Sequence, residues 1–225
     1  MKKVLLCFLL LVSATTLLAS PAKGLLGGKG THVTDGDSEN VVRVEYIESS
    51  GTQYINTGYQ LKSTDSIDCT FQTLYYGRTG LLGARINLGD NQYEFHFVNQ
   101  TLYGFYNNQR SGANISSNIS SNEIYRLEAS QGNYLLNGSI VRTYTVGDFI
   151  NDRPCYLFSV NGYNVSAARI RLFGFNINGG ETMEMKPVRF LNEENEWEGG
   201  LLDIVSGEIF RNQGRGSFLI GPDKN

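Results

Sequence analysis

The sequence predicts an all-β protein that folds as a two-sheet antiparallel β-sandwich. From Val41 onward, short runs of alternating apolar and polar residues are interrupted at short intervals by Gly, Asn, Asp or Ser, which is the pattern of half-buried antiparallel strands. No window of about a dozen residues has the i, i+3, i+4, i+7 apolar stripe of a helix. The 12% aromatic content and only four prolines suit two stacked sheets whose inner faces interdigitate.

The expected strands follow one another along the whole chain after Val41. They span residues 42–48, 53–59, 66–74, 80–86, 92–98, 101–106, 123–130, 133–137, 139–145, 154–160, 167–178, 184–191, 200–204 and 208–211.

Two local features are specific enough to predict backbone geometry. Asn137-Gly138 lies between two apolar runs and predicts a two-residue type I′ hairpin, because both central residues of that turn need a positive φ. The apolar face of the 167–178 strand changes near Leu172 and Phe173. This change predicts either a β-bulge or a strand that is buried on both faces.

The N-terminus predicts export from the cytoplasm. Lys2 and Lys3 precede an apolar run that is too short to span a bilayer and ends in small residues, as in a secretory signal peptide. We expect residues 1–22 to be this signal peptide, residues 23–40 to be a glycine-rich flexible leader, and residues 41–225 to form one domain. The expected location is secreted: extracellular, at the cell surface, or periplasmic.

Charge excludes two classes of partner. The chain has 19 basic and 22 acidic residues. Removing residues 1–22 takes away two lysines and no acid, which leaves 17 against 22 and a charge of -5. A mildly acidic domain with scattered arginines has no electrostatic footprint for nucleic acid or anionic lipid. Separately, no later apolar run is long enough to span a membrane.

Two cysteines remain after processing, Cys69 and Cys155, and both alternate with apolar residues. We therefore expect both side chains to point into the core. An exported chain permits a disulfide between them, and two separate buried thiols are the equal alternative.

Several motifs resemble one family. Gln53-Tyr54-Ile55-Asn56-Thr57-Gly58 is similar to the first-strand signature of bacterial and phage laminin-G-like domains, which belong to the concanavalin A-like lectin and glucanase superfamily. Gly83-Ala84-Arg85, Leu157-Phe158-Ser159 and Lys186-Pro187-Val188-Arg189 resemble later segments, and residues 200–218 resemble the closing strands.

This resemblance covers residues 41 to about 221 and implies a concanavalin A-like jellyroll at a cell surface. It does not imply one function, because sandwich folds of this kind include lectins, hydrolases and spacer domains. The residues that carry it are mostly core and turn residues.

Glycoside hydrolases with this fold place two carboxylates on one face of a strand. The nearest string, Glu181-Thr182-Met183-Glu184-Met185, lacks the central Asp and the second Glu of such a strand. No Gly-x-Ser-x-Gly elbow with a histidine partner occurs either. We therefore expect a protein that is not an enzyme and has no catalytic residue.

The segment from Tyr103 to Arg110 combines aromatic rings, amides and a guanidinium, the mixture that recognises sugars by stacking and hydrogen bonding. The expected ligand-binding residues are Arg85, Tyr103, Tyr106, Asn107 and Arg110. Ordinary strand and loop composition is the alternative.

No cofactor is expected, although some laminin-G domains bind calcium at a loop rim. Asp90, Asn91 and Asp148 are the oxygen-bearing residues that could contribute to such a site.

The leading hypothesis is a secreted, non-catalytic module that binds glycan or another extracellular polymer. The alternative is a structural or adhesive protein that contacts a surface protein, for example by strand addition at a sheet edge. A glycoside hydrolase is the third hypothesis.

Overall fold

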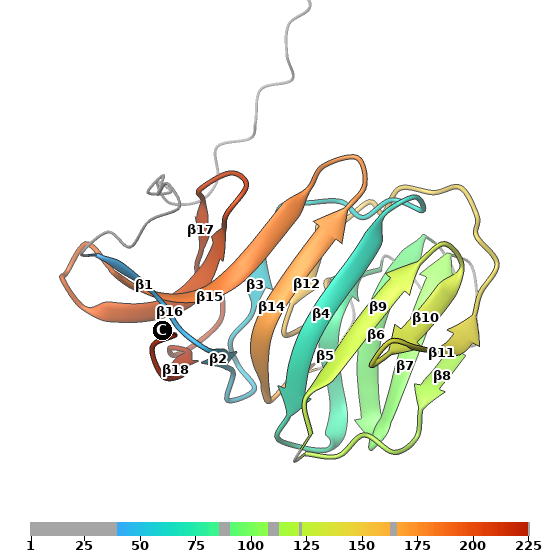
Figure 1. Cartoon of the computed structure of the whole chain (residues 1–225), viewed down its shortest axis with the longest axis horizontal. Helices are drawn as coiled ribbons and strands as arrows, with labels where there is room; N and C mark the ends of the chain where they lie inside the picture. The colour runs from blue at the N-terminus through green and yellow to red at the C-terminus, as the bar shows by residue number, and fades with distance from the viewer. Residues whose placement is uncertain (1–39, 86–90, 108–112, 122, 163–165, 225) are drawn as a thin grey trace, which may run out of the picture.

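The computed structural model describes residues 40–85, 91–107, 113–121, 123–162 and 166–224. None of these residues lies in a helix. The predicted all-β, two-sheet sandwich is confirmed (Figure 1), because the strands form two sheets stacked face to face. All pairings between strands are antiparallel except the short parallel pairing of β13 with β5.

The larger sheet has eleven strands and the main order β11-β10-β9-β4-β14-β15-β16-β17. Its members are β1 (Val41–Arg43), β2 (Ile47–Glu48), β4 (Ser66–Thr73), β9 (Tyr125–Ser130), β10 (Asn133–Leu136), β11 (Ser139–Thr143), β14 (Ile170–Asn178), β15 (Met183–Leu191), β16 (Trp197–Asp203), β17 (Ile209–Phe210) and β18 (Leu219–Ile220).

The smaller sheet has seven strands and the main order β3-β12-β5-β6-β7-β8. Its members are β3 (Ile55–Asn56), β5 (Gly77–Ala84), β6 (Gln92–Asn99), β7 (Thr101–Asn107), β8 (Ala113–Ser116), β12 (Tyr156–Leu157) and β13 (Ser166–Ala167).

The core lies between the two sheets and is rich in aromatic residues. On β4, Cys69 and Phe71 alternate with polar neighbours and are fully buried, and on β6 Tyr93, Phe95 and Phe97 do the same. Phe71 meets Phe97 across the interface with ring centroids 5.7 Å apart. Alternate residues of each strand therefore face either this core or the outer face of their sheet.

Both local predictions of backbone geometry are confirmed. Asn137 (φ 52°) and Gly138 (φ 77°) connect β10 to β11 with Leu136 paired to Ser139, as a type I′ turn requires. The register of β14 against β4 shifts between Leu172 and Gly174. Phe173 is the extra residue of this β-bulge.

The boundaries of some elements differ from those expected. The run 42–48 is divided into β1 and β2, which pair with β15 and β14 respectively. The strands β8, which pairs with the preceding strand β7, and β18, which pairs with the distant β2, were not predicted, because both are short edge elements.

Both cysteine side chains point into the core as predicted, but they do not form a disulfide. Cys69 and Cys155 are free thiols with no exposed surface. Burial is the main cause that raises the pKa of both thiols, that of Cys155 to about 12.

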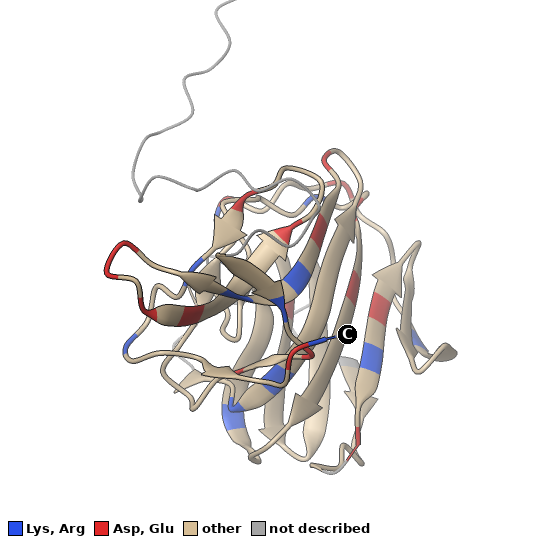
Figure 2. Cartoon of the chain, turned by 60° about the vertical axis from the view of Figure 1, so that its left-hand side comes forward, with Lys and Arg blue, Asp and Glu red and all other residues tan. Residues whose placement is uncertain are grey.

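Basic and acidic residues are distributed over many strands and loops (Figure 2). In the part of the chain that the structure describes, no helix is long and apolar enough to span a membrane.

Candidate functional site

A row of paired residues crosses the outer face of the seven-stranded sheet. Tyr156 of β12 pairs with Asn56 of β3 and with Gly83 of β5, Gly83 pairs with Glu94 of β6, and Glu94 pairs with Phe105 of β7. Directly paired residues point to the same face of a sheet. We call Asn56, Tyr156, Gly83, Glu94 and Phe105 the cross-strand row. It spans five strands, or about 19 Å at the usual strand spacing.

Two tyrosines form one end of this row. The rings of Tyr54 and Tyr156 stack with centroids 4.8 Å apart and planes inclined by 21°. Both side chains are partly exposed, and Asn56 beside them is exposed. Burial raises the pKa of Tyr156, as does Tyr54, while the charge of Arg153 lowers it. This end therefore combines an accessible aromatic surface with an amide and a guanidinium.

A buried carboxylate lies further along the row. Glu94 has no exposed surface, and its Oε1 lies 3.4 Å from Arg85 Nη1 and 3.4 Å from His96 Nδ1. Arg85 and His96 are themselves buried. Within the described residues, neither oxygen of Glu94 accepts a hydrogen bond.

Aromatic rings stack on the imidazole of His96. Its centroid lies 5.2 Å from the ring of Phe105 and 5.8 Å from the ring of Tyr103, with planes inclined by 22° and 21°. Tyr103 pairs with His96 across the strands and is partly exposed. Such offset stacking is a preferred aromatic geometry, and it fixes the plane of the imidazole.

The backbone near Arg85 is fixed by a neighbouring loop. The Arg85 N–H donates to the carbonyl of Asn161 (2.8 Å), and the Asn161 N–H donates to the carbonyl of Gly83 (3.0 Å). The Asn161 side-chain amide also donates to the carbonyl of Pro154 (2.9 Å). The loop that follows β12 thereby holds the end of β5 beside Glu94.

Two of the five predicted ligand-binding residues, Arg85 and Tyr103, meet at this site. The prediction for Tyr106 is wrong. Tyr106 pairs with Tyr93 on the inner face of the sheet, has no exposed surface, and donates its hydroxyl to the carbonyl of Ser63 (2.7 Å). It is a core residue.

The remaining two predicted ligand residues lie apart from the row. Asn107 ends β7 in a left-handed conformation (φ 55°), and its side-chain amide packs where a Cβ on residue 147 would stand. A side chain added at Gly147 would therefore meet the amide of Asn107. Arg110 lies outside the described residues.

The predicted calcium ligands do not form a described site. Asp90 lies outside the described residues. Asp148 is exposed and accepts a hydrogen bond from the hydroxyl of Ser63 (3.5 Å). Asn91 directly precedes β6. Among the described residues, no group of three or more His, Cys, Asp or Glu side chains is arranged to hold a metal ion.

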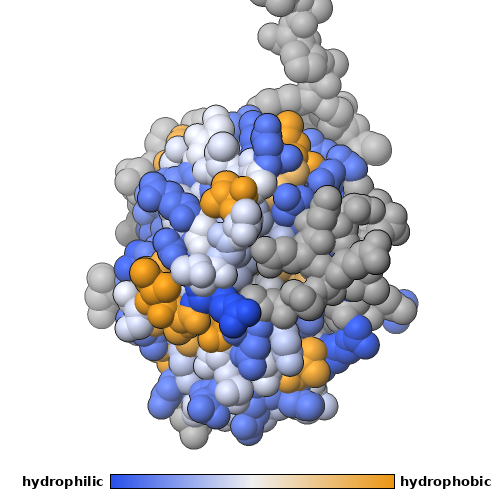
Figure 3. All heavy atoms as spheres, turned by 90° about the vertical axis from the view of Figure 1, so that its right-hand side faces the viewer, coloured by the Kyte–Doolittle hydropathy of each residue, from blue (hydrophilic) through white to orange (hydrophobic). Residues whose placement is uncertain are grey.

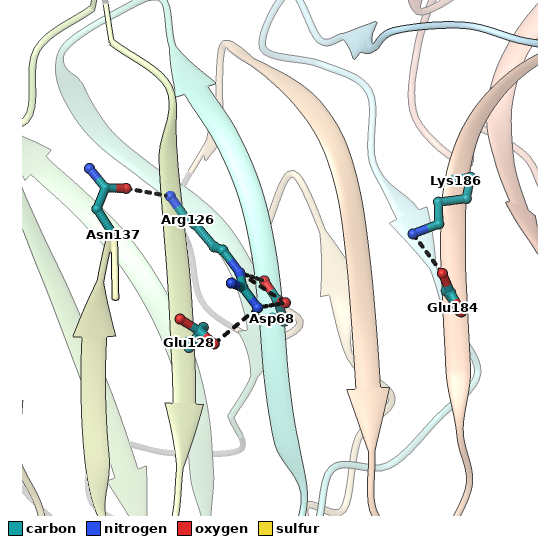
Figure 4. A network of polar contacts seen from close by, with 6 residues as sticks. All are labelled: Asp68, Arg126, Glu128, Asn137, Glu184 and Lys186. Atoms are coloured by element: carbon teal, nitrogen blue, oxygen red, sulfur yellow. Dashed lines mark hydrogen bonds and ion pairs between the residues drawn. The ribbon is translucent and has the colours of Figure 1, made fainter. Parts of the chain in front are cut away.

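The two glutamates considered for hydrolysis lie away from the row. Glu181 is exposed in the turn before β15, and Glu184 points outward from the other sheet, where it binds Lys186 at 2.7 Å. Figure 4 shows this pair on the same face as Arg126, which binds Asp68 and Glu128. Glu184, Asp68 and Glu128 thus already have cationic partners at the surface.

Glu94 and His96 were not among the predicted site residues. The signal that identifies them is the strict alternation of β6, in which Gln92, Glu94 and His96 interrupt Tyr93, Phe95 and Phe97. Because successive side chains of a strand point to opposite faces, these three polar side chains lie on the outer face. Their burial depends on neighbouring strands, so the alternation alone did not reveal it.

Comparison with known proteins supports the fold. No family model matches the sequence, and none of the curated proteins matches it. A crystal structure of a "putative carbohydrate binding protein" from Bacteroides ovatus is similar, with a TM-score of 0.54 and 12% sequence identity over 82% of this chain. The chain spans 61% of the length of that protein. At this identity the similarity shows a shared β-sandwich fold.

Proposed function

We propose that this chain is a secreted, non-catalytic β-sandwich module of the laminin-G-like type that binds carbohydrate through the outer face of its seven-stranded sheet. The observation that carries the proposal is the cross-strand row, with partly exposed tyrosines at one end and a buried Arg85–Glu94–His96 cluster further along. Aromatic surface with a few convergent polar groups is typical of ligand sites. Secretion rests on the N-terminal sequence, residues 1–22.

The similar Bacteroides protein supports the carbohydrate part of the proposal, because its description as a carbohydrate binding protein concerns the same kind of fold. The absence of catalysis rests on the arrangement of carboxylates. Glycosidases use two carboxyl groups about 5 to 10 Å apart across the scissile bond. In the described part of the row, Glu94 is the one carboxylate, and its Oε1 lies 3.4 Å from both Arg85 Nη1 and His96 Nδ1.

The test is titration calorimetry with oligosaccharides of glucose, mannose and galactose, using the wild-type protein and Tyr156→Ala. We expect Tyr156→Ala to weaken binding by about tenfold or more, as loss of an aromatic anchor does. Tyr75→Ala is the matched control, since Tyr75 is 50% exposed and lies outside the row. Absence of binding by the wild type, or equal loss in both variants, would refute the proposal.

Catalysis is tested separately by incubating the protein with the bound oligosaccharides. The proposal predicts that their chain length stays the same. Shorter products that disappear with Glu94→Gln would instead identify a hydrolase.

Strand addition at a sheet edge is the second candidate, and β11 is the observation that favours it. All five residues of β11 are exposed, including Ile140 (62%) and Val141 (37%), at the end of the larger sheet. On the side of the molecule seen in Figure 3, hydrophobic residues form separate patches among hydrophilic ones. However, the register of β11 against β10 shifts at Val141, and such bulges protect edges from further pairing. We therefore rank carbohydrate binding first.

A further inference from the structure

The carboxylate of Glu94 lies beside Arg85 and His96 but accepts no hydrogen bond from a described residue. Arg85 Nη1 and His96 Nδ1 each lie 3.4 Å from its Oε1. Neither Oε1 nor Oε2 accepts a hydrogen bond from a described residue, although Glu94 has no exposed surface. Buried charged groups are normally both paired and hydrogen-bonded, because they have lost their water.

The position of Glu94 points to where a donor would come from. Glu94 points to the outer face of the sheet, directly opposite Phe105 and two strands from Tyr156. The residue between them is Gly83, which places no side chain over this part of the sheet. Tyr156 and Glu94 are thus about 10 Å apart at the usual strand spacing. A sugar stacked in this region would present its hydroxyl groups toward Glu94.

We infer that Glu94 is the specificity-determining residue of this site and that it selects neutral, hydroxyl-bearing sugars over sugar acids. This inference rests on the proposed function. An ionised carboxylate only accepts hydrogen bonds, so the ligand must supply donors, as hydroxyl groups do. A sugar acid would bring a second anion next to Glu94 in a site shielded from water, where repulsion between like charges is strong.

Arg85 does not remove this discrimination. Its guanidinium already lies against Glu94, so one positive charge compensates one negative charge, and a second carboxylate would be left uncompensated. Because Glu94 has no exposed surface, a ligand hydroxyl reaches it only when neighbouring side chains move aside, such as Phe105, which pairs with it across the strands.

The experiment compares galacto-oligosaccharides with galacturonate oligosaccharides of equal length, which differ in the group at C6. Gluco- and manno-oligosaccharides extend the neutral series. We expect the wild-type protein to bind its best neutral oligosaccharide at least about tenfold more tightly than the galacturonate oligosaccharide. Glu94→Gln keeps the shape of the side chain but removes its charge. This variant should bind neutral oligosaccharides about tenfold or more weakly, the usual effect of losing a hydrogen bond to a charged group. The ratio between its affinities for neutral and for galacturonate oligosaccharides should also become smaller.

Glu184→Gln is the matched control. It makes the same change on the outer face of the other sheet, at a carboxylate bound to Lys186, and should leave both affinities unchanged. Should Glu94→Gln fail to fold because Arg85 loses this carboxylate, the double variant Arg85→Gln/Glu94→Gln removes both charges and is measured in its place.

The outcomes separate this inference from the proposed function. Neutral binding that is lost in Tyr156→Ala but unchanged in Glu94→Gln would overturn the role of Glu94 and leave carbohydrate binding standing. Tighter binding of galacturonate by the wild type would also overturn it. No binding of any oligosaccharide by the wild type would instead refute the proposed function.

Discussion

The hydroxyl of Tyr106 donates a hydrogen bond to the carbonyl oxygen of Ser63 at 2.7 Å. This bond joins the inner face of β7 to the segment that leads into β4. The Tyr106 ring also packs against Tyr93, Phe149 and Tyr144, with centroids 5.3, 4.9 and 4.3 Å away. Tyr106 therefore stabilises the interface between the sheets and takes no part in the outer face.

Substitution of Tyr106 should thus affect stability and not ligand binding. Tyr106→Phe removes the hydroxyl and should cost about 1 kcal/mol, while Tyr106→Ala leaves a large cavity and should cost about 3–5 kcal/mol. Urea denaturation measures both. Reduced affinity for oligosaccharides in a fully folded Tyr106→Phe protein would contradict this assignment.

The contrast between Tyr103 and Tyr106 shows which parts of the site were predictable. The two residues are three positions apart on one strand, so they must face opposite sides of the sheet. The residue types predicted a sugar site in this segment, but alternation allows only one of these tyrosines to face it. The alternation in β6 likewise requires Glu94 to lie on the outer face, opposite to Tyr93 and Phe95.

The rest of the site depends on pairing between distant segments. Tyr156 and Asn56 join the row only because β12 pairs with both β3 and β5. A single sequence contains no signal for that register. The fold class was predictable because period-two alternation, the Asn137-Gly138 turn and the bulge at Phe173 are local. The short edge strands β8 and β18 are defined by their partners and were not predicted.

Gly83 should be among the positions least tolerant of substitution. It has a left-handed φ of 116°, and a Cβ there would collide with the backbone of Tyr93 and Glu94. Gly83→Ala therefore combines backbone strain with a clash against a neighbouring strand, and we expect a loss of about 3 kcal/mol or more.

Gly58→Ala separates the two effects. Gly58 also has a left-handed φ, 71°, but nothing lies within 4 Å of the added Cβ. Backbone strain alone should lower the free energy of unfolding of Gly58→Ala by about 1–2 kcal/mol. Chemical denaturation of both variants tests the comparison, and equal losses would show that the close approach of β6 to Gly83 is unimportant.

Asp203 should contribute more to stability than the surface ion pairs of the same sheet. It is buried, and its carboxylate accepts hydrogen bonds from the N–H of Glu184 (2.8 Å) and from the N–H (3.2 Å) and hydroxyl (2.6 Å) of Ser206. Asp203→Ala should cost about 2–3 kcal/mol, because these donors lose a charged partner.

Arg126→Ala is the comparison. Arg126 binds Asp68 and Glu128 in the network of Figure 4, yet its side chain is 54% exposed, so its loss should cost less than about 1 kcal/mol. Thermal unfolding of the two variants shows which substitution lowers stability more. A larger loss of stability in Arg126→Ala than in Asp203→Ala would contradict this prediction.

The buried thiols predict how stability depends on alkaline pH. Burial raises the pKa of Cys155 from 9.0 to about 12, and burial likewise raises the pKa of Cys69. Well below pH 9 the thiols are protonated in both the folded and the unfolded chain and do not change the free energy of unfolding. As the pH rises from 9 toward 12, the unfolded chain loses these protons while the folded protein retains them. Stability must therefore fall over this range.

Buried tyrosines add to the fall as the pH approaches 10. Burial raises the pKa of Tyr106 from 10.0 to about 12, and it also raises the pKa of six other tyrosines: Tyr59, Tyr93, Tyr125, Tyr134, Tyr144 and Tyr156. The loss of stability between pH 9 and 10 is therefore shared between the two thiols and these tyrosines. We expect Cys155→Ala to reduce the slope of melting temperature against pH in that interval, and Cys69→Ala/Cys155→Ala to reduce it further, to the part that the tyrosines contribute. The slope, and not the melting temperature itself, is the quantity to compare, because each substitution also removes core volume. An unchanged slope in the double variant would contradict the assignment to these two thiols.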